Sequence, residues 1–192
     1  MKKRLALAGL ASLALAASTA VPATAAGHEG PTITDIAVAA SGTPNEFDMN
    51  GGDYDILVAA LLATGLNVAT SGADADLTVF APNDEAFMRL VTDLSDGVRP
   101  ATEQDAFAAA AGLPNLVDVL LYHVSAEEKS RTEVVKAGSV TTLSGGATFG
   151  VQGVNLRDGA ALADPKILPE FSNIHASNGV IHTIDRVLVP GS

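Results

Sequence analysis

The 192-residue sequence contains no cysteine and no tryptophan, and it is poor in basic residues. Without cysteine, the chain forms no disulfide, no thiolate metal site and no cysteine-nucleophile centre. Eleven Lys and Arg residues against twenty-two Asp and Glu residues give a net charge of −11. This charge excludes nucleic acid as the expected partner, because phosphates would be repelled. A hydrophobic content of 47% excludes a disordered chain and indicates an acidic globular protein.

The N-terminal 26 residues follow the three-part pattern of a secretory signal peptide. Lys2, Lys3 and Arg4 carry positive charge, an uncharged run of small and apolar residues follows to Ala20, and small residues precede a cleavage site that we place after Ala26. The alternative, a membrane anchor, is disfavoured because the run is short for a span of about 20 residues. We therefore expect secretion into the periplasm or the medium, with no membrane insertion after cleavage. The mature chain would carry a net charge of −14.

Residues 27–31 are predicted to form a flexible lead, and residues 32–190 a single α+β domain. The clearest helix has apolar residues at i, i+3, i+4, i+7 and i+8 from Tyr54, with Asp53 as the expected N-cap and Gly65 as the stop. Shorter helices are expected near residues 33–38, from Asn83 or Asp84 to about Leu90, over 107–111 and after Pro114.

The C-terminal third is expected to consist of β-hairpins. Three dipeptides that favour tight turns, Gly145-Gly146, Asp158-Gly159 and Asn178-Gly179, separate short runs of β-branched or small apolar residues. A helical first half followed by hairpins is typical of the α+β class.

No enzyme motif is found. The sequence contains no G-x-S-x-G, no G-x-x-x-x-G-K and no H-E-x-x-H, and its four histidines are scattered along the chain. We therefore expect no catalytic activity, no cofactor and no metal. Oxygen-bearing residues from Asp48 to Asp55 resemble a calcium loop, but Asp53 occupies the position where an EF-hand needs glycine, and no Glu closes the loop. The favoured interpretation is a turn followed by a capped helix.

Two segments stand out as structural motifs. In Leu77–Phe87, a buried strand is predicted to end at Pro82, and Asn83 or Asp84 then starts a helix, with Phe80 and Phe87 in the core. In Asn178–Pro190, the Asn178-Gly179 turn leads into a strand that contains His182 and Asp185.

We expect these two segments to pair as neighbouring strands. His182 is predicted to be a hydrogen-bonded core residue, because apolar neighbours share its face of the strand. His123 is predicted to point inward from its helix, while Tyr122 points aside.

These two segments, together with Tyr122-His123, resemble the three signatures of the fasciclin (FAS1) domain family, in the family's order and spacing. The resemblance spans about residues 32–190 and implies a wedge of two small β-sheets with helices packed around its edge. It also implies adhesion through protein–protein contacts with an unidentified extracellular protein or cell-surface component.

The resemblance also suggests where contact residues lie. The Tyr-His motif, matched by Tyr122 and His123, is implicated in integrin binding by animal members, as is an Asp-Ile pair. Asn173 and Ile174 occupy that second position, but the acidic group is missing, so integrin recognition does not carry over. Some family members resemble carriers of carotenoids, which leaves an apolar ligand as the alternative. Only two Tyr and six Phe are available to contact a polyene.

Overall fold

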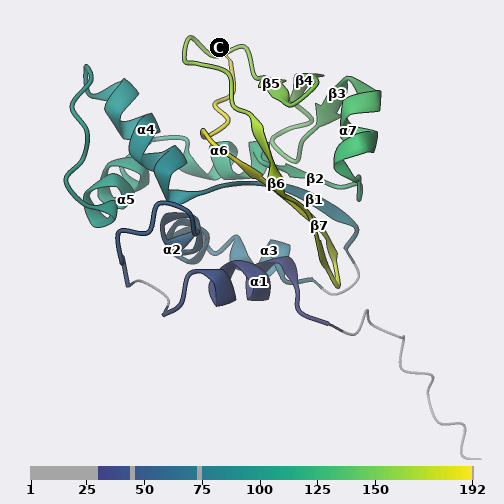
Figure 1. The fold of residues 1–192 in the computed structure, drawn as a ribbon, viewed down its shortest axis with the longest axis horizontal. Helices are drawn as coiled ribbons and strands as arrows, with labels where there is room; N and C mark the ends of the chain where they lie inside the picture. Colours follow the sequence, from purple (N-terminus) through teal and green to yellow (C-terminus); the bar gives the residue numbers. More distant parts are fainter. Residues whose placement is uncertain (1–29, 44–45, 73–74, 192) are drawn as a thin grey trace, which may run out of the picture.

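The computed structural model describes residues 30–43, 46–72 and 75–191 (Figure 1). The predicted signal peptide, and the predicted lead up to residue 29, lie outside the described residues. The helices are α1 Ile33–Ala40, α2 Asp55–Thr64, α3 Asn67–Thr70, α4 Asp84–Leu94, α5 Glu103–Ala111, α6 Leu116–Tyr122 and α7 Arg131–Ala137. The strands are β1 Leu77–Pro82, β2 Val124–Ser125, β3 Ser139–Thr141, β4 Thr148–Gln152, β5 Asn155–Arg157, β6 Ile167–Ala176 and β7 Gly179–Ile184.

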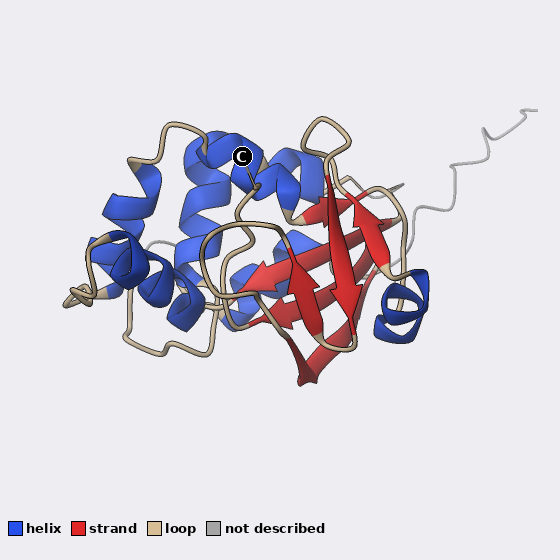
Figure 2. Ribbon diagram, turned by 90° about the horizontal axis from the view of Figure 1, so that it is seen from above, coloured by secondary structure: helices blue, strands red, loops and turns tan. Residues whose placement is uncertain are grey.

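The strands form two small sheets, in agreement with the predicted α+β wedge. The first has the order β2-β1-β7-β6, in which β1 and β7 are parallel and the outer pairs are antiparallel. The second is the antiparallel meander β3-β4-β5. The strands gather on one side of the molecule and most helices on the other (Figure 2), while α7 lies beside the second sheet (Figure 1).

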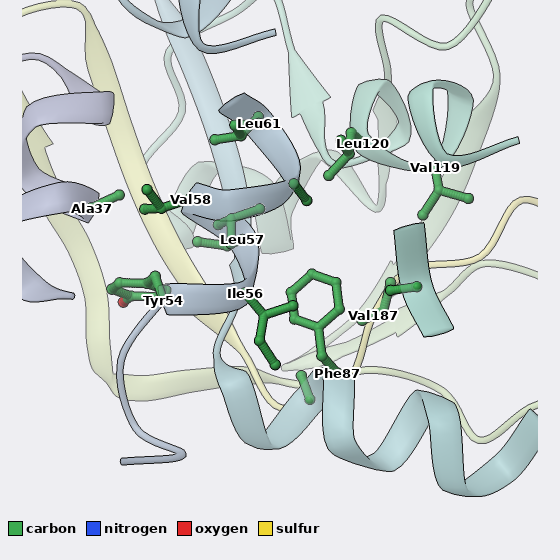
Figure 3. Packing of buried hydrophobic residues seen from close by; sticks show 14 of the residues in the cluster. Ala37, Tyr54, Ile56, Leu57, Val58, Leu61, Phe87, Val119, Leu120 and Val187 are labelled. Atoms are coloured by element: carbon green, nitrogen blue, oxygen red, sulfur yellow. The ribbon is translucent and has the colours of Figure 1, made fainter. Parts of the chain in front are cut away.

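The first sheet separates two hydrophobic cores. Along β1 the side chains alternate, so that Leu77, Val79 and Ala81 join a core shared with the helices, while Phe80 joins a core shared with the second sheet. We call these the helical core and the sheet core. Figure 3 shows part of the helical core, with Phe87 of α4 packed close to α2. Because both faces are covered, every residue of β1 and β7 is buried.

Helix α2 ends as predicted but begins differently. Gly65 terminates it in the left-handed conformation, with φ of 71°. The predicted N-cap, Asp53, is wrong, because Tyr54 occupies that position and makes no side-chain cap. The carboxylate of Asp84, from the start of α4, instead accepts hydrogen bonds from the N–H groups of Asp55 (3.0 Å) and Ile56 (2.9 Å). A residue distant in sequence therefore caps the helix.

One of the three predicted hairpin turns is confirmed, since Gly145-Gly146 lies between β3 and β4. The hairpin of β6 and β7 also forms, but its turn residues are Ser177-Asn178, because Gly179 already belongs to β7 and pairs with Ala176. Asp158-Gly159 is not a hairpin turn, since β4 and β5 are already joined at Gly153. The Asp158 carboxylate accepts hydrogen bonds from the N–H groups of Ala160 (3.0 Å) and Val189 (3.0 Å), which holds the loop against the C-terminal segment.

Among the described residues, no single helix has the length and apolar character needed to cross a bilayer. Helices α5 and α6 meet those limits only when taken together, and they are bent by 106° relative to each other.

Candidate functional site

Strands β1 and β7 bring the two sequence motifs side by side. Their parallel register runs from Leu77 opposite Gly179 to Pro82 opposite Ile184. The predicted pairing of the two segments is therefore confirmed. Around this pair lie the histidines, the Tyr-His motif and the outer strand β6.

His182 connects this pair to two other segments. Its Nδ1 accepts a hydrogen bond from the Asn173 N–H (3.1 Å), and its Nε2–H donates to the Lys129 carbonyl (2.9 Å). The ring is fully buried, 5.7 Å from the ring of Phe80. Burial lowers the pKa of His182, so the neutral imidazole is favoured. The ring thus ties β6 and the loop before α7 to the central strands.

His123, the C-cap residue of α6, is likewise buried and uses both ring nitrogens in hydrogen bonds. Its Nδ1–H donates to the Val119 carbonyl (2.7 Å), and its Nε2 accepts from the Leu188 N–H (2.9 Å). Burial lowers the pKa of His123 to about 4. Both ring nitrogens are used within the protein, so neither is available to a ligand.

Tyr122 points aside from the helical core, as expected, but it is buried in the sheet core. Its ring packs edge to face against Phe149, with centroids 5.7 Å apart, and its hydroxyl donates to the Thr148 carbonyl (3.1 Å). Tyr122 lies two positions after Leu120, which faces the helical core, and it therefore faces away from that core. The second sheet covers this side of α6. The Tyr-His motif consequently contacts the interior on both sides of α6.

We expect Tyr122→Phe to lower the free energy of unfolding by about 1 kcal/mol, because one hydrogen bond is lost while the aromatic packing remains. Chemical denaturation measures this change. If Tyr122 instead contacted a partner directly, the variant would keep native stability and lose binding.

Asn173 and Ile174 lie on β6, apart from the Tyr-His motif. Asn173 is exposed, has a positive φ of 58°, and its side chain accepts a hydrogen bond from the Arg131 N–H (2.7 Å). Ile174 is half-buried and packs against the helical core. The four candidate interaction residues therefore do not form one surface. Sequence reasoning missed Phe171, which is 56% exposed on the same strand.

The remaining motif residues have internal contacts. Asn83 caps α4 through the Ala86 N–H (3.0 Å), and Asp185 accepts from the Lys166 N–H (2.8 Å). Asn178 is buried: its Oδ1 accepts from Ile33 N–H (2.9 Å), and its Nδ2 donates to the carbonyls of Thr70 and Gly72. Pro82 is the last residue of β1, and Phe87 lies in the helical core.

The apolar cavity beside His123 is too small for a ligand of ordinary size. The apolar cavity next to His123, lined also by Tyr54, Leu57 and Ile181, has a volume of about 30 Å³. Pockets for small molecules are typically about 300–1,000 Å³. A polyene therefore does not fit in this cavity without rearrangement of the core.

The structure also assembles a group of acidic side chains that the sequence did not predict. Asp53 and Asp55 from the acidic loop meet Asp84 and Glu103, and all four are buried. The signal in the sequence was the cluster Asp48–Asp55, but its partners come from the starts of α4 and α5. Together with the exposed Asp48, these are the described residues whose carboxylates lie close enough together to hold a metal ion.

The comparisons with known proteins agree with this fold. Residues 52–190 match the family model described as Fasciclin domain. Protein sll1483 of Synechocystis sp. is 36% identical over 138 residues, which cover 71% of this chain and 67% of that protein. The transforming growth factor-beta-induced protein ig-h3 of Sus scrofa is 29% identical over 140 residues, 72% of this chain but 18% of that protein.

Among solved structures, the chain is similar to a FAS1 domain pair from the insect cell adhesion molecule Fasciclin I. The TM-score is 0.56 at 15% identity, and the match covers 83% of this chain and 51% of the other, so this chain spans about half its length. That likeness supports the fold, and the family match covers most of the chain. The chain belongs to the fasciclin domain family.

Proposed function

We propose that this protein is a secreted, non-catalytic module that mediates adhesion to an extracellular protein or cell-surface component. Fasciclin domains are commonly adhesion-related modules, and the solved neighbour is described as an insect cell adhesion molecule. The observation that carries the proposal is that the motif residues Tyr122, His123, Asn178 and His182 make their contacts inside the protein. Recognition is therefore left to the exposed residues.

Strand β6 is the surface that best fits this role. It is an outer strand of the first sheet, and Phe171, Asn173 and His175 are exposed along it. Within the described residues, Phe171 is the one aromatic side chain that is largely exposed. Aromatic side chains are enriched among the residues that dominate protein–protein binding energy. Phe171 is therefore proposed to insert into a pocket of a protein partner.

An adherence assay tests this proposal. We expect a deletion strain to attach less well, wild-type protein to restore attachment, and Phe171→Ser to restore it about tenfold less effectively. Val98→Ser is the matched control, because Val98 is 68% exposed in the loop between α4 and α5. Neither substitution should change the melting temperature, since both side chains are exposed.

Unchanged attachment in the deletion strain would contradict the adhesion proposal, and equal loss in both variants would contradict the role of Phe171.

The alternative, a carrier of an apolar ligand, is tested on protein purified from the native host. A visible spectrum and organic extract of material from the native host should show no pigment. A stoichiometric carotenoid would favour the carrier instead.

A further inference from the structure

Five acidic residues from three parts of the chain meet at one place. Asp48 and Asp53 come from the loop after α1, Asp55 begins α2, Asp84 begins α4 and Glu103 begins α5. Carboxylate oxygens of Asp48, Asp53 and Asp55 lie within 4.8 Å of one another, and so do those of Asp55, Asp84 and Glu103. Asp55 is common to both groups and lies at the centre.

Among the described residues, no side chain donates a hydrogen bond to the central carboxylate, and no basic group pairs with it. Asp55 is 1% exposed, and neither of its carboxylate oxygens has a hydrogen-bond donor. Asp53 is 6% exposed, and its Oδ1 also has no donor. Burying a carboxylate without a donor or a counter-charge is strongly unfavourable. These oxygens therefore favour a positive group beside them, and the part of the chain that the structure describes places none there.

No basic side chain meets this need within residues 30–43, 46–72 and 75–191. The ion pairs of that part of the chain include none of the five acids. The nearby guanidinium groups of Arg89 and Arg99 both pair with Glu85. Among the described residues, no basic side chain therefore balances the charge of the cluster.

The surrounding oxygens are held in place by hydrogen bonds. Both Asp84 oxygens accept from the first N–H groups of α2, and Glu103 Oε2 accepts from the Met49 N–H (2.8 Å). Asp53 Oδ2 accepts from the Asn50 side-chain amide (3.0 Å). These contacts fix the positions of the oxygens that surround Asp55.

We propose that Asp48, Asp53, Asp55, Asp84 and Glu103 form a binding site for a calcium ion. Calcium takes six to eight oxygen ligands, often carboxylates, in a flexible geometry, and the two overlapping groups that share Asp55 offer carboxylate oxygens from five residues. Magnesium demands shorter, near-octahedral contacts and keeps several waters, which suits a buried all-protein cluster less well. Asp48 is exposed and provides the entry side.

A calcium ion here would connect the loop before α2 to the first turns of α2, α4 and α5. Such a cross-link would stabilise a chain that contains no cysteine and therefore no disulfide. Extracellular modules commonly bind calcium with dissociation constants of about 10⁻⁴–10⁻³ M. A site of this affinity suits the secreted location proposed above. Calcium binding itself does not depend on an adhesion function.

Calcium titration of the full domain, after treatment with a chelator, tests this inference. We expect calorimetry to show one ion per chain, and about 2 mM CaCl₂ to raise the melting temperature by about 5 °C. The same concentration of MgCl₂ should give a clearly smaller rise. An equal response to magnesium would overturn the assignment to calcium.

Two variants remove the site while keeping its volume. Asp55→Asn should abolish the calcium-dependent rise, and Glu103→Gln should weaken calcium binding at least about tenfold. Asp105→Asn is the matched control, because Asp105 is an exposed acid in the first turn of α5, and it should respond like the wild type. A rise that persists in both Asp55→Asn and Glu103→Gln, or no heat and no rise in the folded wild type, would overturn the site.

Discussion

Replacement of Gly179 by alanine is expected to be the most destabilising single change, at about 4 kcal/mol or enough to prevent folding. Gly179 starts β7 with φ of 144°, a conformation that is open mainly to glycine. A Cβ atom added there would lie 2.1 Å from the Leu77 carbonyl oxygen and 2.8 Å from the carbonyl carbon and nitrogen of the same residue. These are backbone atoms of the central parallel pair, so no side chain can move to relieve the clash.

Gly153→Ala separates the clash from the effect of a positive φ. Gly153 lies in the turn between β4 and β5 with φ of 62°, and an added Cβ would meet no atom within 4 Å. Its substitution should lower the free energy of unfolding by about 1 kcal/mol. Urea denaturation of both variants makes the comparison. A loss for Gly179→Ala as small as that for Gly153→Ala would show that the strands can separate there, contrary to the structure.

The parts of the fold that could be predicted are those with local signals. The apolar periodicity from Tyr54 and the stop at Gly65 define α2, and the run from Leu77 to Phe80 defines most of β1. The Gly145-Gly146 turn identifies one hairpin for the same reason, because the positive φ of both residues is readily adopted by glycine. The inward position of both histidines also followed from periodicity.

The parts that could not be predicted depend on contacts between distant segments. Asp84 replaces Asp53 as the cap of α2 only because α4 begins beside α2. Tyr122 is buried only because the second sheet, formed by later residues, covers its side of α6. The acidic cluster also depends on such contacts, because Asp84 and Glu103, from the starts of α4 and α5, meet the loop residues Asp48 and Asp53 around Asp55. Spacing along the sequence carries no information about such an arrangement.

The second large effect is expected in the pH dependence of stability, through His123. Its pKa is about 4 in the folded state, where burial disfavours the charged imidazole, against 6.5 in an unfolded chain. Above pH 6.5 the group is neutral in both states and has no effect. As the pH falls from 6.5 to 4, the unfolded state binds the proton first, and the free energy of unfolding decreases by about 3 kcal/mol.

Other groups titrate in the same range, and His182, whose pKa is also lowered, acts in the same direction. Because these groups are present in both proteins, comparison with His123→Gln isolates the contribution of His123. The variant is expected to be less stable than the wild type at pH 7, since glutamine cannot reproduce both ring hydrogen bonds. That difference should shrink by about 3 kcal/mol between pH 7 and pH 4, as measured by denaturation at each pH. His175→Gln is the control, because the His175 side chain is 71% exposed, and it should follow the wild-type curve. If the difference in free energy of unfolding between wild type and His123→Gln did not change with pH, the imidazole would have to bind its proton within the folded core. The hydrogen bond from the Leu188 N–H to Nε2 would then not keep the ring neutral.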